Sequence, residues 1–305
     1  MKIYHAWERR STRPIALAIG FFDGMHRGHA ELARHARLHR KPGGRVGVVT
    51  FANHPATYLR PGHEPELLAT QEERVNALAH AGYEECWLLP FDERIATLSA
   101  LTFLDLLATT LHARALVTGR GFRFGHKRSG DSAMIETFCS ERGIAYTAVD
   151  PVVDESGERI SSTRVRGLVA AGDMESADRL LTASYEIRGR IEVGFGRGHD
   201  LDFPTANLAL EPKLLPKDGI YAATARFDGR DYAALVSIGT NPQFAGTKRT
   251  VEAWLRDFHA TCYGREIALR DFRFVRDQMT FPDVQSLMAM MQRDREAIAY
   301  PNFSS

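Results

Sequence analysis

The sequence predicts two units of different fold class: an α/β unit with a parallel sheet, followed by an antiparallel β-barrel with a C-terminal helix. The first half alternates short continuous apolar runs with helical patterns, which is typical of a parallel sheet covered on both faces. The second half alternates apolar and polar residues, which is typical of half-exposed antiparallel strands. We therefore predict domains spanning residues 1–183 and 184–305.

Five apolar runs define strands of the first unit: IALAIGFF, VGVVTF, CWLLPF, ALVTG and IAYTAV. The helical patterns between them are AELARHARLHR, TQEERVNALAHAG, LTFLDLLATTLHA and AMIETFCSERG. Thr70 and Glu73 have the spacing of a capping box, and Gly82 is placed to end the helix that they begin. This βαβ order predicts a ligand site at the carboxyl ends of the strands.

The second half contains several strand-like segments: YEIRGRIEV, YAATARFDGRDYAALVSI, RTVEAWLRDF and REIALRDFRFV. Asp228-Gly229 lies between two strand-like runs and predicts a tight hairpin. The connecting segment GLVAAGDMESADRLLTAS predicts two short helices, and SLMAMMQRDREAIA predicts the last helix.

The charge balance and the cysteine content limit what the protein can bind. The chain has 39 Lys and Arg against 38 Asp and Glu, so a general nucleic-acid or membrane-surface binder is not expected. Cys86, Cys139 and Cys262 form no CxxC pair, so neither a disulfide framework nor a zinc module is indicated. We expect a soluble protein of a reducing cytoplasm, and no sequence feature indicates an oligomeric state.

The stretch GFFDGMHRGHAEL marks the change from the first long apolar run to a helix. Backbone N–H groups at a helix N-terminus attract anions, and Gly24 and Gly28 permit tight turns and close approach of a ligand. His26 and His29 can then donate hydrogen bonds to a phosphate. Two alternatives stay open at this point: the histidines solvate a turn, or they bind zinc with His35 or His39, although no carboxylate or cysteine has metal-ligand spacing beside them.

GFFDGMHRGH resembles the G-x-FDG-x-H-x-GH signature of bacterial bifunctional riboflavin kinase/FAD synthetases, which are nucleotidyltransferases with an HxGH motif. Further segments resemble the same family in the same order: TFANHPATYLRP, GFRFGHKRSGD, RISSTRVR, FPTANL, GTNPQF, VEAWLRDF and CYGREI. The resemblance spans nearly the whole chain. It implies a Rossmann-like nucleotidyltransferase domain followed by a flavokinase barrel.

For the first unit, the resemblance implies adenylylation of FMN by ATP, giving FAD and pyrophosphate. His26 and His29 would be catalytic, with phosphate-binding groups from Gly24, Gly28, Arg159, Ser162, Thr163 and Arg166. Residues that would line the nucleotide or flavin region are His54, Phe122, Phe124 and Arg128. Taken alone, the Ser-Ser-Thr-Arg run is more typical of a helix N-cap with a solvated arginine, and these four residues equally fit a turn, a core and a solvated surface.

For the second unit, the resemblance implies phosphorylation of riboflavin by ATP, giving FMN. No GxxxxGK[ST] P-loop is present, so a phosphate cradle from Gly194, Gly196 and Gly198 is the expectation. Thr205 and Asn207 would bind Mg²⁺, and Glu252 would be the general base. Without the resemblance, a glycine-rich hairpin and a solvated glutamate explain the same residues.

The chain also departs from the family pattern at several positions. Phe21 stands where a small or polar residue is usual, Ala52-Asn53 replaces an acidic-proline pair, and Gly121 replaces Asn or Asp. Asp202 replaces a glycine and Gln243 a threonine. These departures keep three alternatives open: a chain active only as a riboflavin kinase, a non-catalytic flavin- or nucleotide-binding relative, or a nucleotidyltransferase for a non-flavin phosphate, which leaves the second half unexplained.

Overall fold

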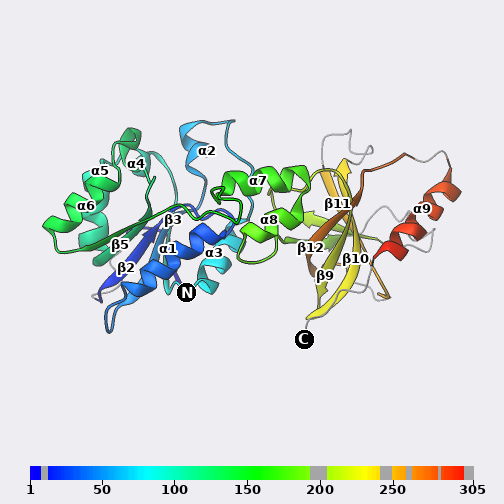
Figure 1. Ribbon diagram of the computed structural model, residues 1–305, viewed down its shortest axis with the longest axis horizontal. Coiled ribbons are helices and arrows are strands. Elements are labelled where there is room, and N and C mark those ends of the chain that lie inside the picture. Colours follow the sequence, from blue (N-terminus) through cyan, green and yellow to red (C-terminus); the bar gives the residue numbers. More distant parts are fainter. Residues whose placement is uncertain (8–12, 193–204, 241–248, 259–262, 281–282, 299–305) are drawn as a thin grey trace. The chain divides into compact units, whose positions relative to one another are not determined.

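The computed structural model describes residues 1–7, 13–192, 205–240, 249–258, 263–280 and 283–298 (Figure 1). The chain divides into two compact units, Met1–Ser162 and Thr163–Ser305. The expected phosphate cradle and two of the departures lie outside the described residues: Gly194, Gly196, Gly198, Asp202 and Gln243.

The first unit is built on a six-stranded sheet in the order β1-β4-β3-β2-β5-β6, in which every neighbouring pair is parallel. Its strands are β1 (Lys2–Tyr4), β2 (Ile15–Ile19), β3 (Arg45–Phe51), β4 (Glu85–Leu89), β5 (Ala113–Gly119) and β6 (Ala145–Val149). All residues of β2 and β4 are buried, as the continuous apolar runs predict. The edge strand β1 was not predicted, since three residues are too few to show a period.

Helices separate these strands along the chain. They are α1 (Arg27–Leu38), α2 (Pro55–Leu59), α3 (Gln71–His80), α4 (Glu93–Ala96), α5 (Ala100–Asp105) with the π-helical turn Leu106–Thr110, the 3-10 turn His126–Arg128, and α6 (Ser132–Glu141). The predicted capping box is confirmed: Thr70 and Glu73 bond each other's backbone at the start of α3. Gly82 follows the end of α3 with φ +93°, a conformation that favours glycine.

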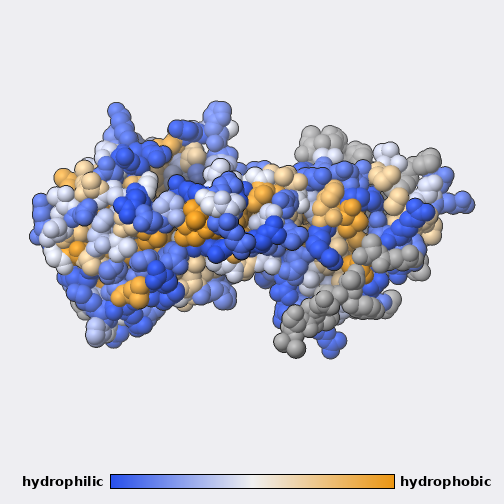
Figure 2. All heavy atoms as spheres, viewed as in Figure 1, coloured by the Kyte–Doolittle hydropathy of each residue, from blue (hydrophilic) through white to orange (hydrophobic). Residues whose placement is uncertain are grey.

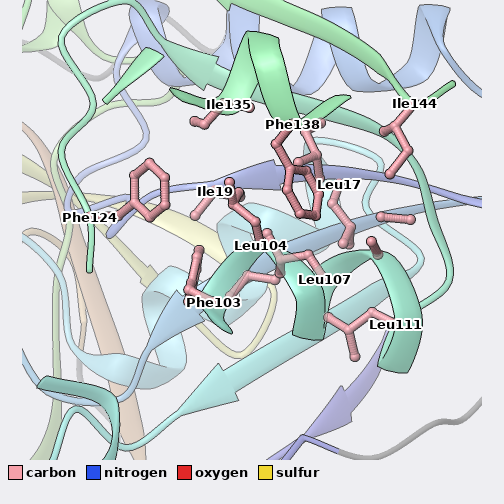
Figure 3. Packing of buried hydrophobic residues seen from close by; sticks show 14 of the residues in the cluster. Leu17, Ile19, Phe103, Leu104, Leu107, Leu111, Phe124, Ile135, Phe138 and Ile144 are labelled. Atoms are coloured by element: carbon pink, nitrogen blue, oxygen red, sulfur yellow. The ribbon is translucent and has the colours of Figure 1, made fainter. Parts of the chain in front are cut away.

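Apolar side chains cover both faces of this sheet. One cluster packs α5, the π-helical turn and α6 against β2 and β5, with Leu17, Leu104, Leu107 and Phe138 among its members (Figure 3). The other packs α1 and α3 against β2, β3 and β5, through residues such as Ala36 and Leu78. The sheet is therefore rigid at its centre, and its carboxyl edge is free to carry the site.

The second unit is a closed barrel in the order β10-β11-β8-β7-β12-β9, and each neighbouring pair of strands is antiparallel. Its strands are β7 (Ile187–Glu192), β8 (Ala206–Leu210), β9 (Gly219–Phe227), β10 (Arg230–Thr240), β11 (Arg249–Leu255) and β12 (Glu266–Arg276). The helices of this unit are α7 (Ser162–Ala171), α8 (Met174–Leu180) and α9 (Val284–Ala297).

The predicted hairpin joins β9 to β10, and Asp228 and Gly229 adopt φ values of +52° and +76° there. Such positive φ values at both central residues suit the twist of the two strands. The parallel sheet, the barrel and α9 confirm the predicted fold class. Hydrophilic side chains predominate over both units on the face drawn in Figure 2.

Candidate active sites

The loop after β2 carries the HxGH segment, and buried hydrogen bonds fix its shape. The Asp23 carboxylate is 1% exposed and accepts the N–H of Leu68 at 2.9 and 3.1 Å and that of Ala69 at 3.2 Å. Gly24 has φ +61°, and a Cβ there would lie 2.7 Å from a methyl carbon of Leu68. A side chain at position 24 would therefore both strain the backbone and displace Leu68.

His26 and His29 lie together at the start of α1. His26 is 7% exposed and caps the helix, because its Nδ1 accepts the N–H of His29 at 3.3 Å. His29 Nδ1 lies 3.1 Å from the carbonyl oxygen of Gly24. The two rings stack with centroids 3.7 Å apart, and the ring of buried Phe22 lies 5.0 Å from that of His29. A Cβ at Gly28 would press on the His26 ring at 3.1 Å, so glycine gives that ring its space.

These contacts give the two histidines different tautomers. A backbone N–H donates to His26 Nδ1, so the proton of neutral His26 is on Nε2. A carbonyl can only accept, so His29 Nδ1 carries its proton and Nε2 of the neutral ring is a lone pair. Loss of solvation and the neighbouring His26 hold the pKa of His29 well below its ordinary value. His26 therefore offers a donor when neutral, whereas His29 gains a second donor only by taking up a proton.

The RISSTRVR segment reaches this loop through Ser162. Its Oγ donates to the Asp23 carbonyl oxygen at 2.8 Å, across 139 positions of sequence. Arg159 is exposed and forms an isolated β-bridge with Val153. Thr163 and Arg166 follow Ser162 in the first turns of α7. Ser162 therefore binds the RISSTRVR segment to the loop that carries His26 and His29.

His54 and Asn53 lie after β3, beside the same edge. His54 caps α2, because its Nδ1 accepts the N–H of Ala56 at 3.1 Å. The Asn53 side chain donates to the carbonyl of Phe91 at 3.0 Å and accepts its N–H at 2.8 Å. Asn53, where the family usually has another residue, therefore joins the segment after β3 to the segment after β4 through its side-chain amide.

The segment after β5 holds the remaining flavin or nucleotide candidates. Phe122 and Phe124 stack with centroids 5.6 Å apart, and Phe124 is 7% exposed within the core cluster. Arg128 is exposed, with φ +60°. Gly121 has open space where a Cβ would stand, so the backbone there has room for the polar side chain that is usual in the family.

Sequence reasoning did not single out two buried charged side chains near this edge, Asp23 and Arg74. Asp23 had a signal, because it lies inside the motif that carries the histidines. Arg74 had none, since it occupies a position in an ordinary helical pattern. Its contacts are with carbonyl groups at the ends of β2 and β3.

In the barrel, strand register brings the kinase candidates together. Asn207 on β8 is paired directly with Glu252 on β11, and Glu252 is paired with Ser237 on β10. The flanking residues Ala206 and Ala253 are buried, so by strand alternation Asn207 and Glu252 share the outer face. Thr205 directly precedes β8 and is partly buried. Asparagine, threonine and glutamate oxygens are hard donors, which fits a magnesium ion.

The zinc alternative finds no support in the described part of the chain, where no group of three or more His, Cys, Asp or Glu side chains could hold a metal ion. Cys86 and Cys139 are buried free thiols. Within the same described residues, no helix has both the length and the apolar character that a bilayer crossing requires.

Comparisons with known proteins match a different family to each half of the chain. The family model described as FAD synthetase matches residues 8–164, and the one described as riboflavin kinase matches residues 181–300. A bifunctional riboflavin kinase/FMN adenylyltransferase from Escherichia coli (strain K12) is 34% identical over 300 residues, covering 96% of each chain. The chain belongs to the bifunctional riboflavin kinase/FMN adenylyltransferase family.

Two further proteins are similar to this chain over nearly its whole length. The Bacillus subtilis (strain 168) enzyme of the same description is 30% identical over 304 residues, covering 97% of this chain and 95% of its own. A crystal structure described as a macrolide-efflux protein from Streptococcus pneumoniae has a TM-score of 0.89 at 29% identity, covering 97% of this chain and 98% of that one. The similarity thus extends over both units.

Proposed function

We propose that the chain makes FAD in two steps. The barrel unit transfers the γ-phosphoryl group of ATP to riboflavin, giving FMN and ADP. The α/β unit then transfers the adenylyl group of a second ATP to FMN, giving FAD and pyrophosphate. The observation that carries this proposal is that each unit brings its own motif residues together: stacked His26 and His29 in one, register-paired Asn207 and Glu252 in the other.

In the α/β unit, an oxygen of the FMN phosphate attacks the α-phosphorus of ATP, and the bond to the pyrophosphate oxygen breaks. No protein nucleophile is needed, so the site must align two anions and offset the developing charge. His26 and His29 meet the triphosphate at the positive end of α1, where Gly24 and Gly28 allow close approach. Phosphate oxygens also receive hydrogen bonds from Ser162 and its neighbours Arg159, Thr163 and Arg166.

In the barrel unit, Glu252 takes the proton of the terminal ribityl hydroxyl, and that oxygen attacks the γ-phosphorus while ADP leaves. Thr205 and Asn207 would hold Mg²⁺, which would supply positive charge to offset that of the phosphates. We place the functional boundary between residues 183 and 184, so that α7 and α8 belong with the adenylyltransferase motif that α7 begins. The buried free thiols Cys86 and Cys139 suit a reducing cytoplasm.

The test is a flavin time course. Purified protein is incubated with riboflavin, ATP and Mg²⁺, and riboflavin, FMN and FAD are separated by chromatography, with a parallel reaction that starts from FMN. FAD in both reactions is the expected result. FMN accumulation with no FAD from either start would leave a riboflavin kinase alone and point to Gly121, whereas no turnover in either would refute the proposal in favour of a binding protein.

A further inference from the structure

Arg74 ties together the segments that follow two neighbouring strands. It stands on α3, is 2% exposed, and directs its guanidinium at backbone carbonyl oxygens. One terminal nitrogen donates to Phe21 at 3.0 Å, after β2, and the other donates to Phe51 at 3.0 Å and Ala52 at 2.9 Å, at the end of β3. A planar guanidinium suits this task, because its donors point in fixed directions toward three acceptors.

The arrangement is costly for a purely structural arginine. Burial lowers the pKa of Arg74, and the charge of Asp23 opposes that effect. Its Nε–H has no hydrogen-bond partner, and the hydrogen bonds of its terminal nitrogens all go to neutral carbonyls within the described residues. A buried charge without a paired carboxylate destabilises a fold. Folded proteins keep such costly groups chiefly at functional sites.

Arg74 also contacts the side chain of Phe21, whose backbone carbonyl it binds. Its guanidinium carbon lies 4.2 Å from the centre of the Phe21 ring. The same ring also contacts His54, which it meets edge to face with centroids 4.7 Å apart. His54 in turn caps α2. The Phe21 ring therefore contacts both the Arg74 guanidinium of α3 and the His54 imidazole at the start of α2.

The two consecutive phenylalanines divide this edge into two sides. The Phe22 ring packs against His29 and, at 6.1 Å, against Tyr83, so it supports the histidine pair at α1. The Phe21 ring packs against Arg74 and His54 and supports α2. Substitutions on the Phe21 side should therefore alter the binding of a substrate beside His54 and leave the binding of a triphosphate at His26 and His29 unchanged.

We propose that Arg74 is a positioning residue for the flavin substrate of the adenylyltransferase reaction, acting through Phe21 on His54 and α2. This inference rests on the proposed function of the α/β unit. Arg74 aligns the carboxyl ends of β2 and β3, and its stack with Phe21 holds His54 where FMN binds beside it. Loss of the stack raises the KM for FMN and leaves the KM for ATP and the riboflavin kinase reaction unchanged.

The experiment compares initial rates of FAD formation from FMN in Arg74→Met, Phe21→Leu and Phe21→Tyr. Arg142→Met is the matched control, because Arg142 also lies over a phenylalanine of this unit, Phe138 at 3.9 Å, away from the site. Riboflavin phosphorylation by the same preparations reports the integrity of the barrel, and circular dichroism reports the folding of the α/β unit. Phe21→Leu keeps the bonds from Arg74 to the backbone, so it decides the question if Arg74→Met does not fold.

We expect Arg74→Met to raise the KM for FMN about tenfold, as expected for the loss of one charge-assisted contact. Phe21→Leu raises it by a smaller factor, while Phe21→Tyr, which keeps the ring, and Arg142→Met behave like the wild type. An unchanged KM for FMN in Arg74→Met and Phe21→Leu, or an equal rise in the KM values for FMN and ATP, would overturn the proposal. Absence of FAD formation by the wild type would instead refute the proposed function, and this inference with it.

Discussion

The two units assemble their sites in different ways. In the α/β unit, side chains distant in sequence meet at the edge of the sheet: Asp23 binds the backbone of Leu68, and Ser162 binds the backbone of Asp23 across 139 positions. In the barrel, Asn207 and Glu252 meet because their strands are neighbours in register. The site of the α/β unit therefore depends on tertiary packing, whereas that of the barrel depends on strand pairing.

This difference sets how each site can fail. A shift of one residue in the pairing of β8 with β11 would exchange the inner and outer faces of a strand and separate Glu252 from Asn207. In the α/β unit, the comparable failure is the loss of a buried hydrogen bond, such as that between Asp23 and Leu68, which would release the loop that carries the histidines.

The sharpest separation of the two units should come from Glu252→Gln. Removal of the general base should lower riboflavin phosphorylation by about 10²–10⁴-fold, while conversion of FMN to FAD continues at the wild-type rate. Rates from both starting flavins measure this directly. Glu266→Gln on β12 is the control, since its side chain is exposed on another strand. Loss of both reactions in Glu252→Gln would contradict two independent sites.

The complementary change, His29→Ala, should affect only the α/β unit. We expect FAD synthesis from FMN to fall by about 10²–10³-fold, because a preorganised phosphate-binding side chain is lost at the start of α1. Riboflavin phosphorylation should not change. His80→Ala, an exposed histidine on α3, provides the control. FAD synthesis at the wild-type rate in His29→Ala would refute the role of the histidine pair.

A substitution that raises activity tests whether the adenylyltransferase reaction of the α/β unit is slowed by the glycine at position 121. Gly121→Asn should raise the rate of FAD formation by about tenfold at most, since it adds one polar group where a Cβ meets no atom within 4 Å. Gly121→Ala adds the same backbone restriction without the amide and should leave the rate unchanged. Equal rates in all three proteins would mean that position 121 does not contact the reacting groups.

Acidification should change the stability of the two compact units by the smallest amount. It should destabilise the α/β unit and stabilise the unit Thr163–Ser305. The lowered pKa of His29 favours its neutral form, so this contribution to the stability of the α/β unit is present above pH 6.5 and is lost as the pH falls below it. Burial raises the pKa of Asp178 on α8 to about 6, so its contribution to the stability of the compact unit Thr163–Ser305 is present below pH 3.8 and is lost as the pH rises through about 6.

Amide hydrogen exchange of each unit between pH 7 and 5 measures both contributions. His29→Gln should weaken the acid-induced loss of protection in the α/β unit, and Asp178→Asn should remove part of the gain in the barrel unit. Asparagine keeps an oxygen that can accept the N–H of Tyr185, as Asp178 does at 2.7 Å. The same pH response in each variant as in the wild type would show that other groups dominate.

Several particular features were predictable from the sequence. The structure contains the predicted capping box at Thr70 and the turn at Asp228-Gly229. It also contains the alternation of strands and helices and the HxGH segment at a helix start. The resemblance also pointed to both reactions, although the roles of individual site residues remain predictions. Periodicity and turn chemistry act between residues a few positions apart, so a sequence displays them directly.

Other features were decided only by the tertiary structure. The carbonyl groups that Arg74 binds lie 53, 23 and 22 positions away, the Asn53 clamp joins residues 38 positions apart, and the tautomers of His26 and His29 depend on which backbone groups face them. No local pattern encodes such contacts, because they exist only after the strands have packed and their ends have met. Local patterns in the sequence therefore predict the two folds and their motifs, whereas the packed structure is needed to see which buried groups hold those motifs in place.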